Sequence, residues 1–161
     1  MLQPMNVHGP TIYWENFEVG QVVPLGEKTV TEDEIISFAL EFDSQPMHTD
    51  PGAAVETMFG GLIASGWHSC ALLMRMICDA YLLESSSLGS PGLDEINFLA
   101  PVRPGDTLKG QMTCLETRAL GSRPEVGIVK VLYEVFNQHG DCVLTWRCNQ
   151  FFGRRPDAGA P

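Results

Sequence analysis

The sequence has few basic residues and no long apolar run. Its 161 residues include 10 Lys and Arg against 20 Asp and Glu, a formal net charge of -10. Because nucleic acids and anionic membranes would repel this charge, we expect neither as a partner. No apolar run approaches the ~18 residues of a membrane-spanning helix, and residues 1–10 show no signal-peptide pattern. We therefore expect a cytoplasmic protein.

Sequence motifs for common cofactors and metals are also missing. There is no GxGxxG motif or P-loop, which argues against a nicotinamide dehydrogenase or a nucleoside triphosphatase. The five cysteines form no CxxC motif, so we expect reduced thiols. His48 and Asp50 are two possible metal ligands without a third nearby, which falls short of a zinc site. We predict no metal.

Apolar residues, by contrast, make up 44% of the chain, enough to fill a core. The length fits one domain, so we predict a single domain over residues 1–161. Residues 1–10 and 154–161 are rich in glycine and proline or lack periodicity, and we expect them to be loose tails.

Three helices are predicted from capping residues and apolar spacing. Thr31 and Glu34 form a capping box before apolar residues at i, i+3, i+4 and i+7, which predicts a helix over 32–42. Asp50 and Pro51 open a second helix, over 51–57. The third, over 66–83, is apolar around nearly its whole circumference, so we expect other structure to enclose it.

About five strands are predicted from alternating apolar and polar residues. They lie near 20–30 and 93–99 and over 108–114, 129–135 and 142–148. Short connections between consecutive strands favour antiparallel pairing. A mostly apolar helix and a sheet with one apolar face predict an α+β fold in which the sheet curls around the helix.

Two segments contain residue types that suit acid–base chemistry on a carbonyl substrate. Asp43 and His48 lie in a proline-kinked loop, where both side chains can point into one pocket and polarise a water. They can also be ordinary loop and surface residues. Gly66 opens the third helix, and its N–H could bind an oxygen that gains negative charge. Ser65 can cap that helix.

The order of these motifs resembles one known family. Asp43-Ser44-Gln45-Pro46-Met47-His48-Thr49-Asp50-Pro51, then Phe59-Gly60-Gly61-Leu62-Ile63-Ala64-Ser65-Gly66-Trp67, is similar to the signature of MaoC-like dehydratases, which include (R)-specific enoyl-CoA hydratases. Residues 96–108 resemble the strand–turn–strand segment of the same family. The similarity covers about residues 12–152 and implies a hot-dog fold, a sheet wrapped around one long helix.

The resemblance also implies an activity and its residues. Asp43 and His48 would be the catalytic pair that holds one water, which adds to a trans-2-enoyl thioester to give a (R)-3-hydroxyacyl-CoA. The Gly66 N–H would stabilise the enolate-like oxygen. Ser65 would lie beside the substrate, with the capping role equally open. Many family members have other residues where this chain has Gln45, Met47 and Ser65, but the acid and the imidazole are both present.

The resemblance extends to ligands and assembly. The substrate would be an acyl-CoA thioester, with no cofactor beyond its coenzyme A, and the chains would form a homodimer or a higher homo-oligomer. The region from 103 onward carries eight basic and six acidic residues, against two basic and fourteen acidic in 1–102. Arg103, in the matched turn, is therefore our candidate for binding the coenzyme A phosphates. The alternatives are an acyl-CoA thioesterase of the same fold and a non-catalytic acyl-CoA-binding partner subunit.

Overall fold

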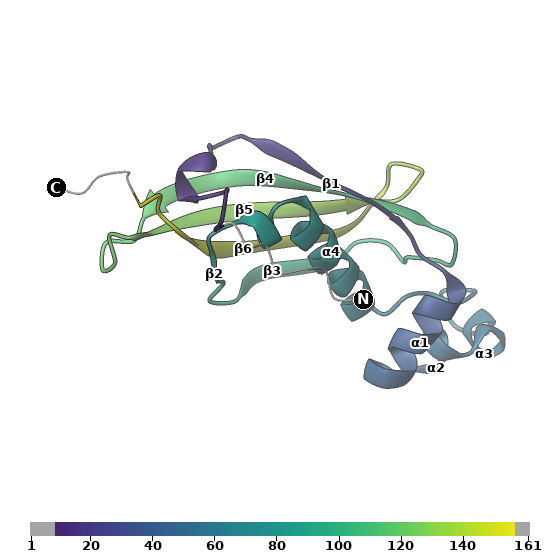
Figure 1. Ribbon diagram of the computed structural model, residues 1–161. Coiled ribbons are helices and arrows are strands. Elements are labelled where there is room, and N and C mark those ends of the chain that lie inside the picture. The colour runs from purple at the N-terminus through teal and green to yellow at the C-terminus, as the bar shows by residue number, and fades with distance from the viewer. Residues whose placement is uncertain (1–8, 157–161) are drawn as a thin grey trace.

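A computed structural model describes residues 9–156, which form one antiparallel sheet with helices on one side and at one end (Figure 1). The sheet has six strands in the order β1-β4-β5-β6-β2, and β3 also pairs with β6. Their bounds are β1 Val22–Thr29, β2 Ser87–Gly89, β3 Leu93–Phe98, β4 Thr107–Ala119, β5 Val126–Phe136 and β6 Cys142–Gly153.

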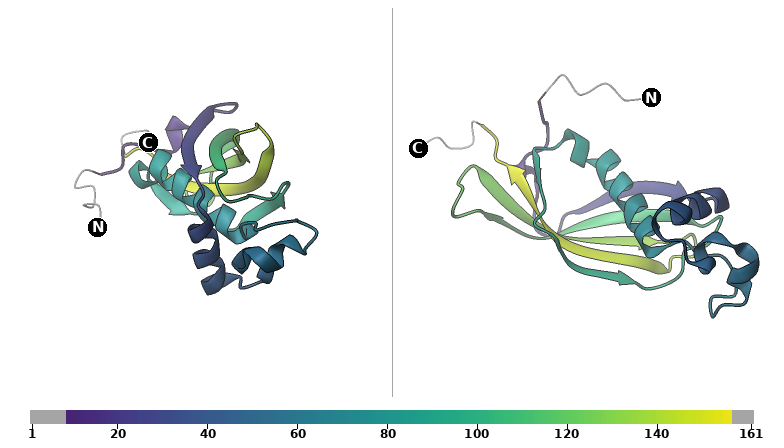
Figure 2. Two further views of the ribbon diagram at one scale, coloured as in Figure 1. Left: turned by 90° about the vertical axis from the view of Figure 1, so that its right-hand side faces the viewer. Right: turned by 90° about the horizontal axis from the view of Figure 1, so that it is seen from below.

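The helices lie in two groups relative to the sheet. The bounds are α1 Glu32–Phe42, α2 Pro46–Thr49, α3 Pro51–Val55 and α4 Gly66–Ala80, with short 3-10 helices η1 Trp14–Asn16 and η2 Leu82–Glu84. Helix α4 lies along the concave face of the sheet, whereas α1, α2 and α3 cluster beyond one end of it (Figures 1 and 2). The predicted α+β hot-dog arrangement is confirmed.

Alternating side chains explain why the sheet packs on α4. In β4, the buried residues include Leu108, Gly110, Met112 and Cys114, as the sequence pattern predicts. Gly110 lies so close to α4 that a Cβ there would be 3.1 Å from the Met76 sulfur. Because a larger residue would push the helix away, this glycine allows α4 to pack closely against the sheet.

Helix α4 is less enclosed than the sequence predicts. Trp67, Ala71, Arg75 and Asp79 are all exposed and recur every four residues, so they form one open face of the helix. The sheet curls around only the opposite side (Figure 2). The prediction of a helix enclosed on nearly all sides is therefore wrong for the single chain. The helix also ends at Ala80 rather than at residue 83.

Other boundaries differ from the prediction in smaller ways. The loop after α1 contains a short helix, α2, and α3 ends at Val55 rather than at residue 57. The strand that the sequence does not predict, β2, has only three residues, too few to show an alternation of apolar and polar residues. Of the predicted tails, residues 1–8 and 157–161 lie outside the described residues, whereas Arg154 contacts Glu15 at 3.3 Å and so is held against η1.

Within residues 9–156, no helix is long and apolar enough to cross a membrane. The five cysteines are all free, and three of them, Cys70, Cys114 and Cys148, are buried. Burial raises the pKa of the Cys70 and Cys148 thiols to about 11, so both stay protonated at neutral pH.

Candidate active site

Asp43 and His48 are brought together by the tight connection between α1 and α2. Helix α1 is fixed by its capping box, in which the Glu34 N–H bonds to Thr31 Oγ1 and the Thr31 N–H to Glu34 Oε2. Asp43 is the C-cap of this helix, and its N–H bonds to the Ala39 carbonyl at 2.9 Å. Pro46 then opens α2, which carries His48.

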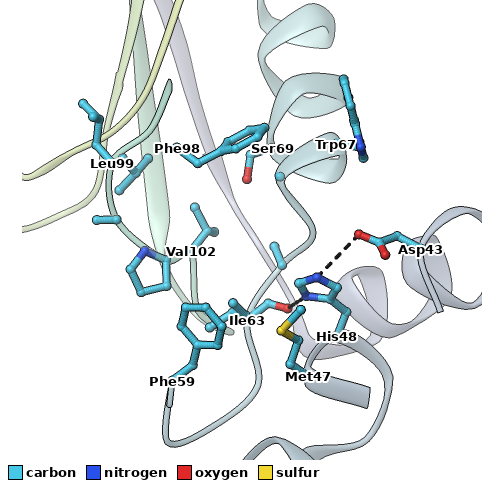
Figure 3. A pocket seen from close by; sticks show the side chains of 15 residues that line it. Asp43, Met47, His48, Phe59, Ile63, Trp67, Ser69, Phe98, Leu99 and Val102 are labelled. Carbon is cyan, nitrogen blue, oxygen red and sulfur yellow. Dashed lines mark hydrogen bonds and ion pairs between the residues drawn. The ribbon is translucent and has the colours of Figure 1, made fainter. Parts of the chain in front are cut away.

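His48 is held in one tautomer by the backbone of another segment. Its side chain is buried, and Nδ1 lies 2.8 Å from the Ile63 carbonyl oxygen. Because a carbonyl only accepts hydrogen bonds, Nδ1 carries the proton. Nε2 then faces Asp43 Oδ2 at 3.5 Å (Figure 3).

Asp43 accepts hydrogen bonds on both carboxylate oxygens. Gln45 Nε2 donates to Oδ1 at 2.7 Å, and Ser65 Oγ donates to Oδ2 at 2.7 Å. These bonds, from Gln45 first and Ser65 second, lower the pKa of Asp43 below its ordinary value and outweigh the opposing effect of burial. Asp43 is therefore an ionised carboxylate at neutral pH.

The pair borders a cavity of about 440 Å³. Its other walls come from the segment 59–66, the start of α4, and the turn that follows β3 (Figure 3). Most of them are apolar: Met47, Phe59, Ile63, Ala64, Phe98, Leu99, Ala100, Pro101, Val102 and Val143. An apolar chamber with a few polar groups at one side is typical of a small-molecule site.

The start of α4 forms one wall of this cavity. Ser65 is the N-cap, and its Oγ accepts from the Trp67 N–H at 3.2 Å while donating to Asp43. Gly66 lines the cavity, and a Cβ there would lie 2.5 Å from the Phe98 ring. Ser65 therefore links the helix terminus to Asp43, and the absence of a side chain at Gly66 makes room for Phe98.

Four of the five predicted site residues thus lie together, and Arg103 does not line the cavity. Its Nη2 donates to the Phe59 carbonyl at 2.6 Å, and its N–H bonds to Asp106 Oδ2 at 2.8 Å. Arg103 therefore supports the segment that carries Phe59. Its contact with substrate stays a prediction.

Comparison with known proteins places this geometry in a family. Residues 16–135 match the MaoC like domain. The chain belongs to the MaoC-like dehydratase family. A crystal structure of a MaoC-like dehydratase from Rhodospirillum rubrum superposes with a TM-score of 0.84 and 35% identity, covering 90% of this chain and 99% of that one.

Two curated relatives show how the sequence similarity is distributed. The uncharacterised protein YdeM of Bacillus subtilis is 32% identical over 124 residues, 77% of this chain and 86% of YdeM. A (R)-specific enoyl-CoA hydratase of Rhodospirillum rubrum is 33% identical over 106 residues, 63% of this chain and 68% of the hydratase. The relatives of this chain therefore include a hydratase and an uncharacterised protein.

The fold itself is shared more widely than the MaoC-like sequence. A Mycobacterium tuberculosis protein with a double hot-dog fold superposes with a TM-score of 0.77 at 17% identity, covering 97% of this chain and 48% of that one. At this identity the likeness shows the hot-dog fold alone.

Sequence reasoning missed several groups of this MaoC-like site. Gln45 appeared only as a departure from the family pattern, yet its amide bonds to Asp43. No sequence pattern indicates the Ile63 carbonyl or Ser69, which lines the cavity. A carbonyl has no sequence signal, and Ser69 lies among apolar helix residues. In the described part of the chain, no cluster of three or more His, Cys, Asp or Glu residues could hold a metal.

Proposed function

We propose that this protein reversibly hydrates a trans-2-enoyl-CoA to a (R)-3-hydroxyacyl-CoA. The observation that carries the proposal is the position of Asp43 Oδ2 and His48 Nε2, which lie 3.5 Å apart at one wall of an apolar cavity. The (R)-specific enoyl-CoA hydratase among the relatives supports this reaction class. Its (R)-specificity also supports the (R) configuration of the product.

The protonation states of the pair suit the activation of water. In the neutral imidazole the single ring proton is on Nδ1, bonded to the Ile63 carbonyl, and Nε2 presents a lone pair beside the ionised Asp43. A water between them can donate one hydrogen to each acceptor. As its oxygen adds to the β-carbon, the pair takes a proton and delivers a proton to the α-carbon. The pair therefore ends the cycle in the state in which it began.

The start of α4 supplies the complementary positive charge. As the C–O bond forms at the β-carbon, negative charge moves onto the thioester oxygen. In the proposal this oxygen accepts from the Gly66 N–H, the first in α4 and a lining group of the cavity. A donor of this kind stabilises the transition state by about 3–4 kcal/mol.

The remaining parts of the proposal concern the coenzyme A and the assembly. In the proposal Arg103 binds the coenzyme A phosphates, and it also holds the Phe59 carbonyl at the cavity wall. We further propose a homodimer joined at the open sheet edge formed by β2 and β3. Both strands pair only with β6 within residues 9–156, and Leu88, Leu93 and Phe98 are exposed along this edge. Unpaired strand edges and exposed apolar side chains favour association.

The test uses purified protein and trans-2-enoyl-CoAs of several chain lengths, followed by the loss of enoyl-thioester absorbance and by product chirality. We expect a (R)-3-hydroxyacyl-CoA from the wild type. Asp43→Asn and His48→Ala should each reduce kcat by about 100-fold or more, since each removes an acid–base group. Release of free thiol instead of hydration would favour a thioesterase.

A matched control separates chemistry from charge. Glu41→Gln removes an exposed carboxylate two residues before Asp43, at the end of the same helix. It should retain wild-type turnover. Full activity of Asp43→Asn or His48→Ala, or an inert wild type across all chain lengths, would refute the proposed reaction.

A further inference from the structure

Ser69 presents a hydroxyl to the cavity, and no other described residue makes a hydrogen bond to this hydroxyl. It lies in α4, lines the cavity and is only 6% exposed. Its N–H bonds to the Ser65 carbonyl at 3.1 Å, but no hydrogen bond among residues 9–156 involves its side chain. Figure 3 shows the hydroxyl oxygen turned toward the space that His48 also borders.

The other polar side chains at this end of the cavity are already engaged. Asp43 accepts from Gln45 and Ser65, and the Ser65 hydroxyl serves Asp43 and the Trp67 N–H. Around Ser69 the wall is apolar, with Phe98 among its neighbours in Figure 3. Because the Ser69 hydroxyl opens onto the cavity and makes no hydrogen bond within residues 9–156, it is free to donate to a polar atom of a bound molecule.

Helix geometry indicates which atom that is. Side chains of an α-helix lean toward its N-terminus, and residues three apart share one face. The Ser69 hydroxyl therefore reaches back over the turn that begins at Gly66, and both residues line the same cavity. In the proposed function the Gly66 N–H binds the thioester oxygen.

We propose that Ser69 Oγ–H donates a second hydrogen bond to the thioester carbonyl oxygen of the substrate. The inference rests on the proposed hydratase function and adds a side-chain donor to the backbone donor at Gly66. As the oxygen becomes enolate-like, this bond strengthens. Ser69 then stabilises the transition state more than it stabilises the bound substrate.

The kinetic test compares Ser69→Ala with the wild type on crotonyl-CoA. Loss of a donor that acts mainly in the transition state should lower kcat by about 10- to 100-fold while KM changes by less than about 3-fold. Ser69→Thr keeps the hydroxyl and should retain most of kcat. As a control, Ser44→Ala removes an exposed hydroxyl next to Asp43 and should leave both constants unchanged.

A spectroscopic test reads the hydrogen bond directly. In an Asp43→Asn background, which slows turnover, infrared difference spectra of crotonyl-CoA labelled with ¹³C at the thioester carbonyl report the strength of bonding to that oxygen. Adding Ser69→Ala should raise the carbonyl stretching frequency of the bound substrate. This measurement holds even where Ser69→Ala lowers the amount of folded protein, because it observes only bound ligand.

The outcomes distinguish this inference from the proposed function. If the wild type is inert on enoyl-CoAs, both fail together. If the wild type is active and Asp43→Asn is not, while Ser69→Ala keeps kcat within about 2-fold and leaves the carbonyl frequency unchanged, only the role of Ser69 is overturned. A change confined to KM overturns it as well, because it would mean equal binding of substrate and transition state.

Discussion

Ser65 makes two hydrogen bonds with different consequences. As the N-cap of α4, its Oγ accepts from the Trp67 N–H, and the same hydroxyl donates to Asp43 Oδ2. The first bond stabilises the helix. The second helps to keep the pKa of Asp43 low, so the carboxylate stays ionised.

Ser65→Ala should therefore change both stability and the pH–rate profile. Loss of the cap should cost about 1 kcal/mol in the free energy of unfolding, measured by urea denaturation. Loss of the donor to Asp43 should raise the pKa of this carboxyl. On acidification, the variant should therefore begin to lose activity at a higher pH than the wild type does. The acid limb of the kcat/KM profile should shift to higher pH relative to the wild type.

Thr31→Ala is the matched control for this prediction. Thr31 caps α1 through its own hydroxyl and makes no hydrogen bond to Asp43 among the described residues. It should lower stability by a similar amount and leave the acid limb in place. An unmoved acid limb in Ser65→Ala would show that Gln45 alone sets the ionisation of Asp43.

At the scale of elements, His68 lies at the contact between α1 and α4. Its ring is 6% exposed and stacks on Phe38 at 4.7 Å, and Nδ1 is buried without a hydrogen-bond partner among residues 9–156. Burial is the main cause that lowers the pKa of His68, opposed by Glu34 and reinforced by Lys28.

This burial predicts a loss of stability in mild acid. A folded-state pKa below the unfolded value near 6.5 means that the unfolded chain binds the proton first. The contribution of His68 is therefore complete above pH ~6.5 and declines as pH falls toward its folded pKa. Glu34, whose pKa is lowered to about 2 chiefly by Lys28, stays ionised in the folded chain over this range. The small slope that it adds near pH 5 is present in both the wild type and His68→Leu.

Urea denaturation between pH 7 and pH 5 measures the effect. His68→Leu should flatten the pH dependence relative to the wild type, because an apolar side chain of similar size cannot take up a proton. His139→Gln, in an exposed turn, should keep the wild-type slope. An equal slope in wild type and His68→Leu would show that water reaches the ring.

Elements with local signals were predictable from the sequence, and contacts between distant segments were not. Helix α1 runs over residues 32–42 as predicted, because its capping box and apolar spacing lie within the helix itself. Strand β4 continues to Ala119, beyond the predicted residue 114, because its pairing with β5 extends to Gly127. Pairing of this kind has no local pattern.

The same distinction holds at the site. Asp43 and His48 lie five residues apart and could be recognised as a pair from that spacing and from the family motif. The Ile63 carbonyl is fifteen residues from His48, and only the folded chain brings the two within hydrogen-bond distance. Ser69 has a helix position that predicts burial, but its direction toward the cavity depends on how α4 packs on the sheet.

For the whole molecule, the open face of α4 and the open edge of the sheet lie side by side. The Phe98 ring, at the end of β3, packs against Gly66, at the start of α4. Next to this contact, Trp67 is 61% exposed. A large exposed indole beside an open strand edge with exposed apolar side chains is costly in water, and a second chain covering both would remove that cost.

The proposed homodimer makes a direct prediction for mass in solution. Wild-type protein should sediment at twice the chain mass, and Leu93→Glu should shift the equilibrium to single chains, because a buried carboxylate at the joined β3 edges lacks a partner. Leu93 is exposed in the single chain, so the substitution should leave the fold intact, as circular dichroism would verify. Leu40→Glu, which alters an exposed leucine on α1, is the control and should remain dimeric. If Leu93→Glu and Leu40→Glu sediment alike, the two chains do not meet at this edge, and the open face of α4 has to be covered in another way.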